Sequence, residues 1–87
     1  MASYSVRIKK SAAKELEAVP RKDRERIIGR IRALGENPRP AGAEKLAGAT
    51  DKFRLRQGDY RILYTVEDES LTVDVVKIGH RKDVYRR

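Results

Sequence analysis

Three arginines in the segment DKFRLRQGDYRILY, residues 51–64, are the clearest candidates for chemistry in this sequence. Arg54 and Arg56 alternate with apolar residues before a turn at residues 57–59, and Arg61 continues the pattern after it. A guanidinium donates two parallel hydrogen bonds to a phosphate and keeps its positive charge at neutral pH. Arginines gathered in this way predict a surface that binds a phosphate-bearing anion.

The overall charge favours the same kind of partner. The 87 residues include 21 lysines and arginines against 13 aspartates and glutamates, which gives a net charge of +8 and an isoelectric point near 10.1. Such an excess of positive charge raises the on-rates of polyanions, so we expect a nucleic acid, an acidic protein or both as partners.

Composition also limits the class of protein. A chain of 87 residues, 1–87, fits one small domain with a single thin core. It has no cysteine and one histidine, so we expect no metal site and no cofactor. No apolar run reaches the ~18 residues of a membrane-spanning helix, and residues 1–10 lack the apolar stretch of a signal peptide. We therefore expect a soluble, cytoplasmic protein that does not engage a membrane.

The elements that carry the arginines are predicted to form an α+β fold. In residues 3–9 apolar and polar side chains alternate, which is typical of a strand with one buried face, and Ile8 belongs to that face. Ser11 stands at the N-cap position of a short helix. Pro20 ends that helix and begins a second one, which ends at Gly35.

The second half of the chain is predicted to be β-structure. Residues 35–50 contain two prolines and three glycines and predict a connecting loop. Three strands follow at residues 52–57, 60–67 and 70–78, with Gly79 ending the last one. Because the turns between them are short, these strands form an antiparallel meander. The two helices cover one face of the sheet, and the C-terminal tail lies against its edge.

Alternation within the strands predicts a second, open face. Phe53 and Leu55 share one parity and pack on the helices, so the arginines between them project to the opposite side. The cations assigned to this open face are Arg7, Lys9, Arg54, Arg56 and Arg61. The acidic residues cluster in the turns, so no carboxylate in register offsets the repulsion among these cations. The open face is therefore predicted to be cationic, exposed to solvent and suited to a bound anion.

The arginines of the second predicted helix have a simpler interpretation. They surround an apolar stripe, and we assign them to a solvated face. They are Arg24, Arg26, Arg30 and Arg32.

Taken in order, these segments resemble the RelE/ParE superfamily of type II toxin-antitoxin toxins, and within it the RelE-type ribosome-dependent mRNA endonucleases. The matching pieces run along nearly the whole chain: LEAVPRKDRERI, NPRP, KLAG, FRLRQGDYRILY and IGHRKDVY. The resemblance implies a RelE-like fold. It also implies metal-independent cleavage of mRNA in the ribosomal A site, in which the ribose 2′-hydroxyl attacks the adjacent phosphate.

The same resemblance implies roles for individual residues. The catalytic set that it implies comprises Arg56, Arg61, Arg81 and Tyr85, to which we add His80 as acid or base. We assign Arg7, Lys9, Arg54 and Lys82 to RNA binding, and the resemblance also aligns Arg54 with the family's catalytic cations. The best-known member of the family has two lysines where this chain has Arg54 and Arg56, and a guanidinium is a poor proton acceptor. Imidazoles exchange protons near neutral pH, and Lys82 and Tyr85 are substitutes for His80 in that role.

The expected partners follow from the resemblance and the charge. They are a cognate antitoxin whose small acidic or amphipathic segment wraps the toxin, mRNA in the ribosomal A site, and ribosomal RNA. Two alternatives stay open: a ParE-like inhibitor of DNA gyrase that lacks the nuclease site, and a catalytically silent RNA-binding module. The joint presence of the predicted arginines and the C-terminal tyrosine favours the endonuclease.

Overall fold

The structure, a computed structural model, describes residues 3–48 and 51–80. Their elements are β1 (Ser5–Ile8), α1 (Lys10–Glu17), α2 (Arg21–Ala33), β2 (Glu44–Lys45), β3 (Lys52–Gln57), β4 (Tyr60–Glu67) and β5 (Thr72–His80). The predicted α+β class is confirmed. No helix among these residues is long and apolar enough to cross a membrane.

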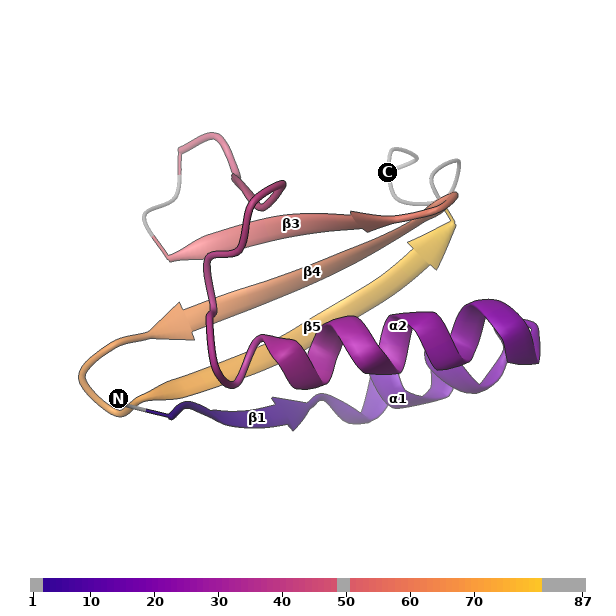
Figure 1. The fold of residues 1–87 in the computed structure, drawn as a ribbon, viewed down its shortest axis with the longest axis horizontal. Coiled ribbons are helices and arrows are strands. Elements are labelled where there is room, and N and C mark those ends of the chain that lie inside the picture. Colours follow the sequence, from indigo (N-terminus) through magenta and orange to yellow (C-terminus); the bar gives the residue numbers. More distant parts are fainter. Residues whose placement is uncertain (1–2, 49–50, 81–87) are drawn as a thin grey trace.

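The described strands form one mixed sheet in the order β1-β5-β4-β3-β2. β3, β4 and β5 make the predicted antiparallel meander, while β1 pairs parallel with β5. Buried residues of both helices belong to one core cluster with the strands, and Figure 1 shows the chain rising from the end of α2 toward β3. The order places β1 and β2 at opposite edges.

The core lies between the helices and one face of the sheet. The apolar stripe of α2 supplies Ile27, Ile31 and Leu34, and β3 supplies Phe53 and Leu55, all buried. The prediction that Phe53 and Leu55 share the buried face of their strand is confirmed. Burying such side chains, at about 25 cal/mol per Å² of apolar surface, is the main stabilising contribution available to a chain without disulfides.

Tyr64 is the largest of the fully buried side chains and carries a polar group into the core. Its hydroxyl donates a hydrogen bond to the Pro38 carbonyl oxygen at 2.8 Å, and its ring stacks on Phe53 with centroids 5.7 Å apart. A buried hydroxyl without an acceptor would be destabilising, so this bond fixes the loop after α2 to the sheet.

A surface network holds the same loop from outside. Arg39 makes two hydrogen bonds to Asp68, at 3.2 and 2.8 Å, and its guanidinium lies 5.5 Å from the centre of the Phe53 ring. The Tyr4 hydroxyl donates to the same carboxylate at 2.6 Å. The loop that leads from α2 to β2 is thereby attached to the turn between β4 and β5.

Two predictions at the start of the chain were wrong. The Lys9 amide continues the ladder with the Val75 carbonyl while the Lys9 carbonyl already accepts from Ala13, so α1 begins at Lys10 and Ser11 lies inside it. Ile8 is 39% exposed, because an edge strand of four residues has a neighbour on one side only.

Two further differences lie in the β-structure. The predicted loop at residues 35–50 contains the two-residue strand β2, and the last strand continues through Gly79 to His80. Gly79 pairs with Arg61, and a glycine opposite a large side chain leaves room for it without interrupting the ladder. The remainder of the predicted tail lies outside the described residues.

Candidate functional site

A cavity of about 300 Å³ opens where α2, the loop after it and the strands β2 to β4 meet. Its described lining residues are Arg30, Gly42, Glu44, Arg54, Arg56 and Arg61. The structure thus brings together three of the four arginines that the sequence placed on the open face, and it adds Arg30 and the carboxylate of Glu44.

The β3–β4 hairpin sets the position of the strand arginines. Its two-residue turn begins at Gly58, whose φ of +61° is a left-handed conformation that glycine adopts without a steric cost. The resulting register places Arg56 directly opposite Arg61, and Arg54 lies two residues earlier on the same side of β3. Like charges opposite one another repel, so this register favours an anion between them.

Arg61 differs from the prediction in its burial. The sequence predicted a side chain projecting into solvent, but Arg61 is only 4% exposed, and its Nη1 donates to the Tyr60 carbonyl at 3.5 Å. A charge removed from water interacts more strongly with a nearby opposite charge, because the effective dielectric constant is lower there. Arg61 is therefore placed to stabilise a negative charge that forms in the cavity.

Glu44 is the residue of β2 that lines the cavity, and the sequence did not predict its role. Its Oε1 lies 2.6 Å from Arg54 Nη2. The pKa of Glu44 is lowered first by this hydrogen bond and by the charge of Arg54, and then by the charges of Arg56 and Arg61. The expectation that no carboxylate offsets the arginines was wrong, because β2 pairs Glu44 with Arg54 across the sheet edge.

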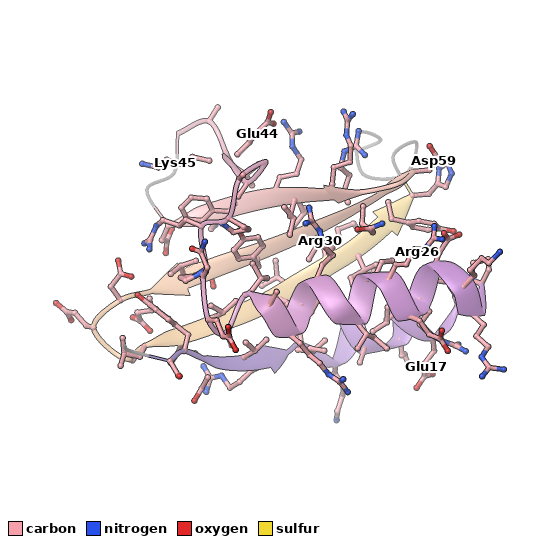
Figure 2. All side chains as sticks on the ribbon, in the orientation of Figure 1. Glu17, Arg26, Arg30, Glu44, Lys45 and Asp59 are labelled. Atoms are coloured by element: carbon pink, nitrogen blue, oxygen red, sulfur yellow. The ribbon has the colours of Figure 1, made fainter. Side chains whose placement is uncertain are left out.

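Arg30 was assigned to a solvated helix face, and that assignment was wrong. Figure 2 shows Arg30 reaching from α2 toward the strands, and its Nη2 donates to the Arg56 carbonyl at 3.3 Å. Its Nε is buried without a hydrogen-bond partner among the described residues. One sequence signal could have revealed it: Arg30 stands three residues after Ile27 and four before Leu34, at the border of the buried stripe.

The predicted RNA-binding residues of the first strand lie elsewhere. Arg7 forms a two-pronged ion pair with Asp74 of β5, at 2.9 and 3.2 Å, and β5 and β4 separate it from β3. Lys9 lines a different cavity, which also includes Leu46 and Leu63. The open face is thus partly apolar, and its cations do not form one continuous surface.

His80 also lies away from the cationic cavity. It pairs with Tyr60 across β4 and β5, with the two rings edge to face and their centroids 5.4 Å apart. It lines a separate cavity together with Glu15 and Lys77. The other residues predicted near it, Arg81, Lys82 and Tyr85, lie outside the described residues.

Comparison with known proteins places this geometry in a family. A family model described as the ParE toxin of the type II toxin-antitoxin system parDE matches residues 6–85. The chain is 32% identical to Toxin RelG of Mycobacterium tuberculosis, covering 97% of this chain and 98% of that relative. It is 33% identical to the mRNA interferase toxin RelE of Escherichia coli, covering 92% and 85%.

A solved structure gives the same result. A chain of the archaeal RelE-RelB complex from Pyrococcus horikoshii superposes with a TM-score of 0.83 and 29% identity, covering 98% of this chain and 99% of that one. The family model and these relatives span the strands and the helix that line the cationic cavity, and the chain accordingly belongs to the RelE/ParE superfamily of type II toxin-antitoxin toxins.

Proposed function

We propose that this toxin is a ribosome-dependent endoribonuclease that cleaves mRNA. The observation that carries the proposal is the cavity in which four of the described arginines and one glutamate converge. Relatives named mRNA interferase support the same activity, since they match over most of the chain. Its target places its action in the cytoplasm.

The proposed reaction is attack of a ribose 2′-oxygen on the adjacent phosphorus. The new bond from the 2′-oxygen to phosphorus forms as the bond from phosphorus to the 5′-oxygen breaks, which leaves a 2′,3′-cyclic phosphate and a 5′-hydroxyl. Negative charge grows on the nonbridging oxygens, and Arg61 and Arg56 lie across from each other to receive them. In this scheme guanidiniums supply the charge stabilisation, without a metal ion.

The 2′-hydroxyl must also lose a proton. Among the described residues that line the cavity, Glu44 is the one that can accept it, because arginine is a poor proton acceptor. Its lowered pKa keeps the carboxylate ionised, with Arg54 holding it in place at 2.6 Å. We therefore assign Glu44 the role of general base. A proton donor for the 5′-oxygen is left to Tyr85, which the resemblance implies is part of the catalytic set.

The proposed protein partner is a cognate antitoxin. Solved neighbours from Mycobacterium tuberculosis and Escherichia coli are toxin-antitoxin complexes named RelBE, which supports an antitoxin of the RelB kind for this chain. An acidic segment would meet an arginine-lined cavity in a protein of net charge +8.

The test is cleavage of mRNA on programmed ribosomes by the purified toxin, with 5′-hydroxyl ends at the new termini. The same preparation is assayed for DNA breaks trapped by gyrase, because the matching family model carries the ParE name. Intact mRNA together with gyrase-trapped DNA breaks would mean that the chain is a gyrase inhibitor and not an endonuclease. Binding of RNA without cleavage or gyrase breaks would leave the silent RNA-binding module.

A further inference from the structure

We propose that Arg30, on α2, is an anion-binding and positioning residue of the cationic cavity, so that the phosphate is bound by the helix as well as by the β3–β4 hairpin. The identity of the anion rests on the proposed function. The contacts of Arg30 that support this proposal are present in the structure whether or not the protein cleaves RNA.

The first observation is the contact between Arg30 and β3. Its Nη2 donates to the carbonyl oxygen of Arg56 at 3.3 Å, and the Arg56 side chain lines the same cavity opposite Arg61. The helix thus holds the backbone at Arg56, and that backbone position determines how the Arg56 and Arg61 guanidiniums approach each other. A bound phosphate needs those two groups at fixed positions, which makes Arg30 a positioning residue.

The second observation is the unused hydrogen-bonding capacity of Arg30. A guanidinium has five N–H donors, and the bond to Arg56 uses one of them. Nε is buried and has no acceptor within the described part of the chain. A buried charged donor without an acceptor is unfavourable and requires an explanation.

A purely structural arginine would be expected to have a carboxylate partner. The carboxylate at this cavity, Glu44, accepts from Arg54 instead. A phosphate in the cavity brings several acceptor oxygens and a negative charge next to Arg30, and so compensates for its burial. The anion would therefore supply the hydrogen-bond acceptors and the negative charge that the described residues do not give Arg30.

The experiment compares the full chain with Arg30→Ala, Arg30→Lys and Arg32→Ala. Arg32 is an exposed arginine of the same helix that lines an apolar groove with Val6 and Ile8. The probe is inorganic phosphate, and its binding is followed by NMR of the arginine Nε–H groups. We expect the Arg30 signal to shift on titration, and Arg30→Ala to weaken phosphate binding at least about tenfold, as for a lost hydrogen bond to a charged group. Arg30→Lys should bind with intermediate strength, since an ammonium does not reproduce the fork.

Arg32→Ala should bind phosphate within about twofold of the parent. A folded Arg30→Ala that also binds within twofold, or a parent Arg30 signal that does not respond to phosphate, would overturn the proposal. If Arg30→Ala does not fold, the test rests on the phosphate affinity of Arg30→Lys and on the response of the parent Arg30 NMR signal to phosphate. If Arg30 binds phosphate but the protein leaves mRNA intact, the proposed function is wrong and this inference stands. If the protein cleaves mRNA but its phosphate binding does not depend on Arg30, this inference is wrong and the proposed function stands.

Discussion

Arg61 combines a positive charge with almost complete burial, and that combination shapes the experiment that tests it. Arg61→Ala removes a buried side chain and so lowers stability as well as charge. Arg61→Lys keeps the charge but loses the two-pronged geometry. We expect single-turnover cleavage by Arg61→Lys to fall by at least ~10², as for the loss of an oxyanion donor.

Ribosome association is the control for that variant. An interaction made mainly in the transition state should leave binding nearly unchanged while the rate falls. An Arg61→Lys protein that cleaves as fast as the parent would remove Arg61 from the proposed mechanism.

Glu44 gives a prediction about pH. Because Arg54 lowers its pKa, the carboxylate stays ionised below the ordinary glutamate value of about 4.3. Loss of cleavage through protonation of the base should therefore begin only below that value, and the rate between about pH 5 and 7 should show no loss from this group. A rate that already falls between about pH 6 and 7 would contradict Glu44 as the base, because its carboxylate is ionised throughout that range. Glu44→Gln should abolish the low-pH limb together with most of the rate.

At this scale the sequence identified part of the site. The alternation of Arg54 and Arg56 is a local pattern, and strand geometry converts it directly into a shared face. Glu44 and Arg30 reach the cavity through tertiary contacts, one from a two-residue strand and one from a helix. No local periodicity encodes such contacts.

Among the elements, the β3–β4 hairpin has the clearest dependence on one residue. Gly58 has a φ of +61°, and a left-handed conformation costs a residue with a Cβ roughly 1–2 kcal/mol. Gly58→Ala should lower the free energy of unfolding by about 1 kcal/mol in urea denaturation, although its Cβ meets no atom within 4 Å.

Gly29 provides the matched comparison for that change. It is an exposed glycine inside α2, and a Cβ there also meets nothing within 4 Å. Alanine has the higher helix propensity, so Gly29→Ala should raise the free energy of unfolding by roughly 0.5–1 kcal/mol. Equal changes in the free energy of unfolding for the two substitutions would mean that the left-handed backbone conformation of Gly58 does not determine the stability of the hairpin.

The elements themselves were largely predictable. The helices and the three long strands follow from periodicity, since burial of one face imposes a period on each. The start of α1 was not predictable from Ser11, because pairing of Lys9 with β5 determines where the strand stops and the helix begins. β2 was missed because its two residues are too few to show any alternation.

For the whole molecule, strand order decides which cations act together. β5 and β4 lie between β1 and β3, so Arg7 is distant from the cavity. The sequence could not show this, because apolar and basic residues alternate in the same way in both strands. Each phosphate contact on single-stranded RNA contributes about 0.7 to the slope of log affinity against log salt. Arg56→Ala should therefore lower that slope by about 0.7, whereas Arg7→Ala should leave it unchanged because Arg7 is paired with Asp74. A lower slope for both variants would extend the RNA-binding surface across the sheet.

The burial of Tyr64 makes the protein its own optical probe. The chain has four tyrosines and no tryptophan, so tyrosine dominates its near-ultraviolet absorption. Burial raises the pKa of Tyr64 from 10.0 to about 12, which means that the folded state favours the protonated phenol. Between these two values an unfolded chain would ionise this phenol and the folded chain would not, so stability declines as pH rises through the window. The hydrogen bond to Asp68 also raises the pKa of the exposed Tyr4, so the probe is a Tyr4→Phe variant. In that variant, late appearance of the tyrosinate band would mark the opening of the core, without any attached label.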